Sequence, residues 1–175
     1  PAFRNTTVAS PREEGGYEVV PAERQITIRH LLTHTAGIAY GSGAGSDRWE
    51  QAGITGWYFA HRDEPIQRTV ERIASLPMPS QPGSAWVYGY NTDILGALIE
   101  TVAEQPLDEF LQERIFTPLG MTDTHFYLPR DKRNRLATVY SISDGSLVRA
   151  PDAGGITGSQ GAYVDGPRKS FSGGA

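Results

Sequence analysis

The residues most suited to chemistry are two tyrosines, Tyr88 and Tyr90, in the stretch PGSAWVYGYNTDILGALIE at positions 82–100. A turn dipeptide opens this stretch, and Gly89 between the tyrosines allows another backbone to approach closely. A phenol held on such a loop, beside the start of a helix, is well placed to accept or donate a proton during catalysis. On this pattern alone, packing of both rings in the core is the simpler interpretation.

The elements that must position these tyrosines follow from the hydrophobic spacing. Asn91 or Thr92 can cap a helix over 92–104, whose apolar residues recur at helical intervals. The pattern predicts three more helices: a short one that follows Thr27 and stops near Gly37, one over 65–75, and one that starts at Pro106 and ends at Pro118. Period-two character predicts short strands over 124–128 and 136–142. Residues 1–25, the glycine-rich stretch 40–47 and the chain after 142 are predicted to be irregular.

The composition excludes several classes of protein. With 16 basic and 20 acidic residues, the net charge of −4 offers no basic field for nucleic acid. The chain has no cysteine, which rules out disulfides and thiolate metal sites and leaves the cellular compartment open. No apolar run approaches the length of a membrane span. The chain starts at Pro1 rather than at a methionine, and on this basis we expect it to be a segment of a longer protein.

Other candidate sites are weaker. His30 and His34 stand four residues apart and could share a metal on one helix face, but no third ligand is evident, so we expect hydrogen-bonded structural histidines. The loop GSGAG at 41–45 follows a predicted helix and has no nearby lysine, which disfavours phosphate binding. Residues 61–64 are expected to form a solvated charge run, and Trp57 is either part of an acyl pocket or a packing residue.

Three strings in this order resemble the serine β-lactamase and penicillin-binding protein family: ITIRHLLTHTAGI at 26–38, PGSAWVYGYNTDILG at 82–96 and IFTPLGMTDT at 115–124. The chain is most similar to the branch of class C β-lactamases and β-lactamase-like carboxylesterases. The resemblance implies an α+β fold of the β-lactamase/transpeptidase type, of which residues 1–175 supply a partial domain, mostly helical with a few short strands. It implies neither a metal nor another cofactor.

The family's nucleophile lies in a Ser-x-x-Lys motif, and this stretch of sequence contains none. The chain has two lysines, Lys132 and Lys169. The residue three positions earlier, where the motif has serine, is Pro129 in the first case and Gly166 in the second. We therefore expect the nucleophile upstream of residue 1 and the family's third motif downstream of residue 175, and an isolated 175-residue chain that is inactive.

The resemblance also implies roles for the two tyrosines. Counting back from Asp93 and Gly96, Tyr88 falls on the family tyrosine that moves the serine's proton, so it is the expected general base. Tyr90 stands where many β-lactamases have an asparagine that holds the substrate amide, and it is expected, with Trp57, to contact substrate. This departure favours carboxylic esters over β-lactams.

The expected function is therefore acyl transfer by a serine hydrolase acting on small-molecule esters, with β-lactams less favoured. The alternatives are a D-alanyl-D-alanine carboxypeptidase or acyltransferase, and a non-catalytic relative that binds similar ligands. The compartment and the oligomeric state do not follow from the sequence.

Overall fold

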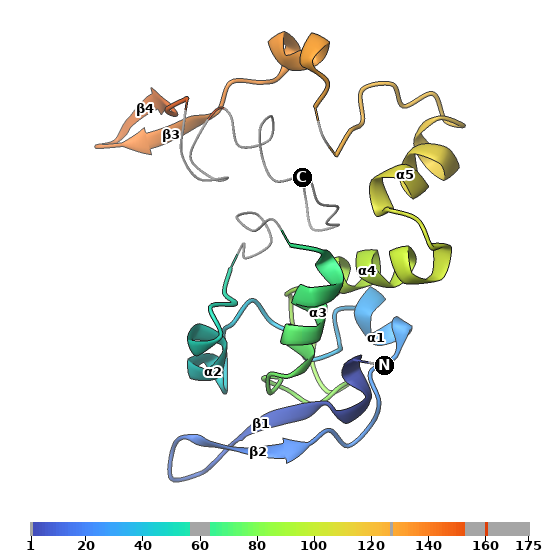
Figure 1. Ribbon diagram of the computed structural model, residues 1–175. Coiled ribbons are helices and arrows are strands. Elements are labelled where there is room, and N and C mark those ends of the chain that lie inside the picture. The colour runs from blue at the N-terminus through green and yellow to red at the C-terminus, as the bar shows by residue number, and fades with distance from the viewer. Residues whose placement is uncertain (1, 57–63, 127, 153–159, 161–175) are drawn as a thin grey trace.

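The computed structural model describes residues 2–56, 64–126, 128–152 and 160 (Figure 1). Two parts differ in character, and we call them the N-terminal body (residues 2–111) and the C-terminal arm (residues 112–152). The body carries a hydrophobic core, whereas Ala150 is the one buried residue described in the arm.

The body begins with a 3-10 turn, η1 (Ala2–Asn5), and a hairpin of β1 (Thr7–Pro11) and β2 (Tyr17–Pro21). The two strands are antiparallel, with Val8 opposite Val20. The outer side of β1 is bridged to the chain at Met78, where Ala9 N–H donates to Met78 O and Met78 N–H donates to Thr7 O, both at 2.8 Å. The expectation of an irregular N-terminus was therefore wrong, because these short strands depend on the distant partner Met78 as well as on their own sequence.

Helices fill the rest of the body. They are α1 (Ile28–Leu32), α2 (Ser46–Gln51), α3 (Ile66–Ala74), α4 (Asn91–Ala103) and α5 (Leu107–Leu111). The predicted helices at 65–75 and 92–104 are confirmed to within one residue at each end. Helix α4 packs against α1, α3 and α5 and so joins the helices of the body (Figure 1).

Two predictions about this region need correction. Helix α1 ends at Leu32, five residues before Gly37, because the backbone turns at His34 into the left-handed region (φ 54°). Helix α2 was not predicted, since six residues bury only one side chain, Trp49, whose indole N–H donates to Pro77 O at 2.9 Å.

The core lies between the hairpin, α3 and α4. Its least exposed large side chains include Trp49, Ile54, Ile73, Met78 and Tyr90. Each Å² of apolar surface that is buried stabilises the fold by about 25 cal/mol. This cluster is therefore the main source of stability in the described chain.

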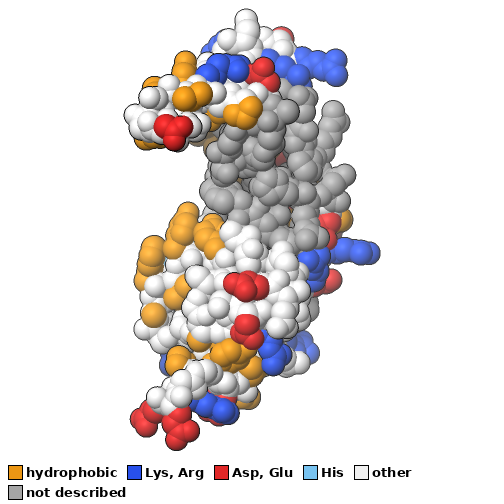
Figure 2. All heavy atoms as spheres, turned by 90° about the vertical axis from the view of Figure 1, so that its left-hand side faces the viewer, with side chains coloured by type: hydrophobic (Ala, Val, Ile, Leu, Met, Phe, Trp, Pro, Cys, Tyr) orange, Lys and Arg blue, Asp and Glu red, His pale blue; other side chains and the backbone are white. Residues whose placement is uncertain are grey.

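The arm starts as a π-helical turn, η3 (Gln112–Phe116), that continues α5 toward Pro118. It goes on through a 3-10 turn, η4 (Arg130–Arg135), to an antiparallel hairpin of β3 (Tyr140–Ser143) and β4 (Ser146–Arg149). This hairpin lies at the opposite end of the molecule from β1–β2 (Figures 1 and 2). Its large apolar side chains, Tyr140, Ile142, Leu147 and Val148, are all exposed.

The strand predictions in the arm were only partly right. The described residues of 124–128 form no strand, and the predicted strand 136–142 is shifted to 140–143. Asp123 instead ties this segment to η4 through ion pairs with Lys132 (3.1 Å) and Arg135 (2.6 Å). Charged contacts of this kind leave no periodic signal in the sequence. No helix in the described part of the chain is long and apolar enough to cross a membrane.

Candidate active site around Tyr88

The loop that carries Tyr88 is fixed by the segment after α1. Gly83 N–H donates to Thr35 O and Val87 N–H donates to His34 O, each at 2.7 Å. Two of the strings that carried the family resemblance, HTAG and the tyrosine loop, therefore form one hydrogen-bonded unit.

Two glycines make this close contact possible. A Cβ on Gly89 would lie 2.2 Å from Ile38 O and 2.5 Å from the Ala39 Cα, so no other residue fits there without moving the backbone. Gly37 has φ 81°, and a Cβ there would lie 2.2 Å from Ser80 O. The prediction that Gly89 permits a close backbone approach is confirmed.

Tyr88 projects from this fixed loop into solvent, with 56% of its surface exposed. Its ring stacks on His34 (centroids 4.9 Å apart, planes at 29°) and on Trp86 (5.9 Å, 20°). Tyr40 meets the same ring edge-on at 5.6 Å. The Tyr88 phenol is therefore accessible on a hydrogen-bonded loop, with three aromatic neighbours, and is available to exchange a proton with a bound group.

Tyr40 is a site residue that the sequence reasoning missed. Burial raises its pKa to about 12, and the negative charge of Asp93 and the hydrogen-bonding contact with Tyr88 add to the shift. The burial of Tyr40 therefore favours its protonated form, which can donate a hydrogen bond. Its position directly before Gly41, in the string HTAGIAYG, was the available signal.

Tyr90 lies in a different environment from Tyr88. Its side chain is fully buried, and its hydroxyl donates to Gly56 O at 2.7 Å. The ring stacks against Trp49 (6.2 Å, 9°) and meets Tyr40 edge-on (4.6 Å). This placement gives Tyr90 a packing role and disfavours the predicted contact with substrate, which stays untested. Trp57, the other predicted substrate contact, lies outside the described residues.

Asn91 does not cap α4, contrary to the expectation. The helix has Tyr90 at its N-cap, with no side-chain capping bond. Asn91 is instead completely buried, and its Nδ2 lies 3.1 Å from His34 Nδ1 and 3.3 Å from both Ile38 O and Val87 O. The amide thus joins the tyrosine loop to the segment 34–38.

Both histidines make hydrogen-bonding contacts, as expected. His30 forms a capping box with Thr27: its N–H donates to Thr27 Oγ1 (3.2 Å) and its Nδ1 accepts from Thr27 N–H (3.3 Å). His34 is past the end of α1, so the two imidazoles do not share a helix face. The sequence feature that points to His34 as a residue of the site is its place in the HTAG string rather than its spacing from His30.

Lys132, the one lysine that the structure describes, is engaged in the arm. Its ammonium donates to Thr122 O and His125 Nε2 (3.1 Å) and pairs with Asp123 (3.1 Å). Lys169 lies outside the described residues. Any ammonium group that assists Tyr88 is therefore not Lys132.

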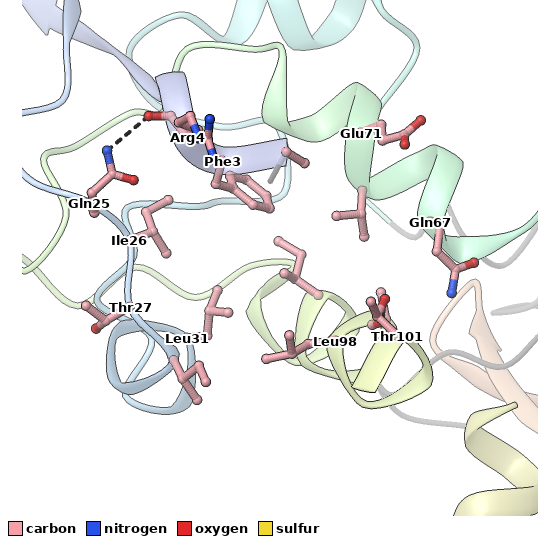
Figure 3. Close-up of a pocket in the computed structure, with 15 residues that line it drawn as sticks. Phe3, Arg4, Gln25, Ile26, Thr27, Leu31, Gln67, Glu71, Leu98 and Thr101 are labelled. Atoms are coloured by element: carbon pink, nitrogen blue, oxygen red, sulfur yellow. Dashed lines mark hydrogen bonds between the residues drawn. The ribbon is translucent and has the colours of Figure 1, made fainter. Parts of the chain in front are cut away.

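A separate apolar groove of about 500 Å³ lies between η1, α1, α3 and α4, and Tyr88 does not line it. Phe3, Ile26, Leu31 and Leu98 line it, while Gln25 donates to Arg4 O at 3.0 Å beside it (Figure 3). Its lining is mainly apolar, with Arg4 and Glu71 as the charged side chains, and we place the candidate active site at Tyr88 instead.

Comparisons with known proteins identify the family and the fold of this chain. Lovastatin esterase from Penicillium rubens is 36% identical over 139 residues, which cover 77% of this chain and 33% of the relative. Esterase EstB from Burkholderia gladioli is 36% identical over 133 residues, covering 75% and 33%. The chain thus spans about a third of the length of these curated relatives.

A solved structure of simvastatin synthase (LovD) from Aspergillus terreus superposes with a TM-score of 0.65 at 28% identity, covering 93% of this chain and 42% of that one. The structure of EstCE1, a hydrolase with promiscuous acyltransferase activity, gives a TM-score of 0.63 at 27% identity, covering 82% and 35%. The shared architecture is the α+β fold of β-lactamases and transpeptidases. The family profile described as Beta-lactamase matches residues 17–164, and this chain belongs to the β-lactamase family.

Proposed function

We propose that this chain is part of a serine hydrolase that transfers acyl groups from carboxylic esters, with Tyr88 as the group that moves the nucleophile's proton. The observation that carries the proposal is the contrast between two neighbouring tyrosines. Tyr88 is exposed on a loop that three backbone contacts hold rigid, whereas Tyr90 is committed to the core. The nucleophilic serine and its lysine belong to a Ser-x-x-Lys segment outside these 175 residues.

The proposed chemistry proceeds in two halves. In the first, the serine Oγ forms a bond to the acyl carbonyl carbon while its proton passes to the phenolate oxygen of Tyr88. Collapse of the tetrahedral intermediate breaks the bond to the alcohol, and Tyr88 returns the proton to the departing oxygen. In the second, water or another alcohol attacks the acyl-serine, gives up its proton to Tyr88 and releases the acyl group, and the proton returns to the serine.

Tyr88 needs electrostatic help for this role. Only the phenolate form of a tyrosine can take up the proton of the serine. A nearby ammonium group favours the phenolate, and the motif lysine is the group proposed to supply it. Tyr40, which stays protonated, can add a hydrogen bond to the Tyr88 oxygen.

Esters are favoured over β-lactams by the residue two positions after Tyr88. A β-lactamase of this type presents an asparagine amide there, but Tyr90 has its hydroxyl bonded to Gly56 O inside the core. The printed names of the relatives, esterases and methylbutanoyltransferases, support small-molecule esters as acyl donors. An alcohol as acyl acceptor is the second candidate, because monacolin J acid methylbutanoyltransferase from Aspergillus terreus is 36% identical over 106 residues.

The test uses the complete gene product. We expect turnover of p-nitrophenyl butyrate, a serine-linked butyryl adduct in the mass spectrum of the quenched reaction, and a much lower kcat/KM for a chromogenic cephalosporin. The isolated 175-residue chain and a heat-treated sample serve as inactive controls. No turnover together with no labelling by a fluorophosphonate probe would instead identify a non-catalytic ligand-binding relative.

A further inference from the structure

His34 contacts the tyrosine loop in two ways. Its carbonyl oxygen accepts the Val87 N–H at 2.7 Å, and its imidazole stacks on the ring of Tyr88. Both contacts are made by a residue in the left-handed backbone region (φ 54°), which is uncommon outside glycine although histidine, asparagine and aspartate enter it more often than other residues. A residue held in such a conformation at a candidate active site points to a positional requirement.

The Asn91 amide fixes the His34 ring. The carbonyl oxygens of Ile38 and Val87, each 3.3 Å from Nδ2, require a donor, so the orientation of the amide is determined. Nδ2 also lies 3.1 Å from His34 Nδ1, so its two hydrogens are shared among three acceptors, and Nδ1 accepts one of them in the tautomer that carries the imidazole proton on Nε2. Because Asn91 is fully buried, this support is shielded from water.

We propose that His34 is the positioning residue for Tyr88, with Asn91 fixing the imidazole on which the phenol rests. The proposal rests on the proposed role of Tyr88 in proton transfer. The phenol is more than half exposed, so the stack on His34 limits where its oxygen can lie. Displacement of a reacting group by about 1 Å can cost about 100-fold in rate.

The decisive variant is His34→Asn in the complete gene product. The asparagine Oδ1 can occupy the place of Nδ1, and asparagine tolerates the positive φ, so both the bond to Asn91 and the backbone contact to Val87 persist. Only the ring is lost. We expect kcat for p-nitrophenyl butyrate to fall about 10- to 100-fold with little change in KM or Tm.

His30→Asn is the matched control. His30 lies in the same segment and is also half-buried, but its contacts are to Thr27 rather than to Tyr88. We expect its kcat to stay at the wild-type value.

A double-mutant cycle with Tyr88→Phe separates positioning from a general structural role. If His34 acts through Tyr88, His34→Asn causes no further loss of kcat once the hydroxyl is gone. Multiplying losses, or a wild-type kcat for His34→Asn when Tyr88→Phe is impaired, would overturn the proposal.

A second readout does not depend on activity. In protein with isotope-labelled tyrosine, the ring signals of Tyr88, assigned from their loss in Tyr88→Phe, should shift and broaden in His34→Asn. Unchanged Tyr88 signals would refute the positioning role. If Tyr88→Phe kept full activity, the proposed function would fail, and these signals alone would still decide whether His34 positions the ring.

Discussion

The N-terminal body and the C-terminal arm differ in what holds them in place. In the body, long-range hydrogen bonds and a shared core fix a loop that exposes Tyr88. In the arm, exposed ion pairs around Asp123 hold the chain, and four apolar side chains of the β3–β4 hairpin remain exposed. Surface ion pairs contribute little to stability, whereas buried apolar contacts contribute much. The part of the described chain with the larger buried core is thus the part that carries the candidate chemistry.

The largest difference in the free energy of unfolding is expected when isoleucine is replaced by alanine in each of the two regions. Ile73 is fully buried in the body, and Ile142 is 79% exposed in the arm. Replacing Ile73 with Ala should lower the free energy of unfolding by about 2–5 kcal/mol, because it leaves a cavity. Ile142→Ala should stay within about 0.5 kcal/mol.

Thermal melts of the complete gene product measure both variants. Equal losses of Tm would contradict the proposed difference in packing between body and arm, since they would show that the hairpin is buried as deeply as the core in the intact protein.

The next largest effect is expected when the buried amide of Asn91 is changed. Asn91→Asp keeps the shape of the side chain but replaces the donor with an acceptor that faces the Ile38 and Val87 carbonyls. Leaving such groups unpaired costs about 1–3 kcal/mol each. We expect a clear fall in Tm and in kcat.

The matched control is Asn134→Asp, at an exposed asparagine in η4 of the arm. We expect it to leave Tm and kcat near the wild-type values. A similar response from both asparagines would show that the amide network around Asn91 contributes nothing special.

A smaller effect concerns the alkaline limit of stability. Burial raises the pKa of Tyr40 to about 12, so between about pH 10 and 12 the unfolded chain releases a proton that the folded chain retains. The free energy of unfolding should therefore fall as pH rises through this window, and less steeply in Tyr40→Phe. Urea unfolding at pH 8 to 11.5 measures the slopes, and identical slopes in the two proteins would rule out this linkage.

The smallest effect is expected at Asp123 in the arm. Hydrogen bonds from Arg135 and Lys132 hold the pKa of this carboxyl well below its usual range. Its contribution is thus present above the ordinary carboxyl pKa of about 4 and is lost as pH falls toward the lowered folded value. Asp123→Asn should lower Tm slightly at pH 7, and the difference should shrink below pH 4. A large loss at pH 7 would mean that the arm depends on these ion pairs more than exposed pairs normally allow.

The sequence predicted the body better than the arm for a physical reason. Helices α3 and α4 bury one apolar face each, so their spacing was visible along the chain. Helix α2 and the strand β1 depend on distant backbone at Pro77 and Met78, which no local pattern shows. In the arm, the contacts between charged side chains around Asp123 leave no periodic pattern in the sequence.

The candidate site was predictable in part. The string YGYN located the tyrosine loop, and Gly89 indicated a close backbone approach, but neither told which tyrosine is exposed. The roles of His34 and Asn91 could not be predicted, because they arise from contacts across 57 positions of the chain.

The most direct test of the account is kcat for p-nitrophenyl butyrate in Tyr88→Phe, measured beside Tyr90→Phe in the complete gene product. Tyr88→Phe removes an exposed hydroxyl and should lower kcat by about 10² to 10⁴, with little change in Tm. Tyr90→Phe removes a buried hydroxyl bonded to Gly56 O, so it should lower Tm while kcat changes much less. A full loss of kcat in Tyr90→Phe with wild-type activity in Tyr88→Phe would contradict the assignment of Tyr88 as the proton-transfer group.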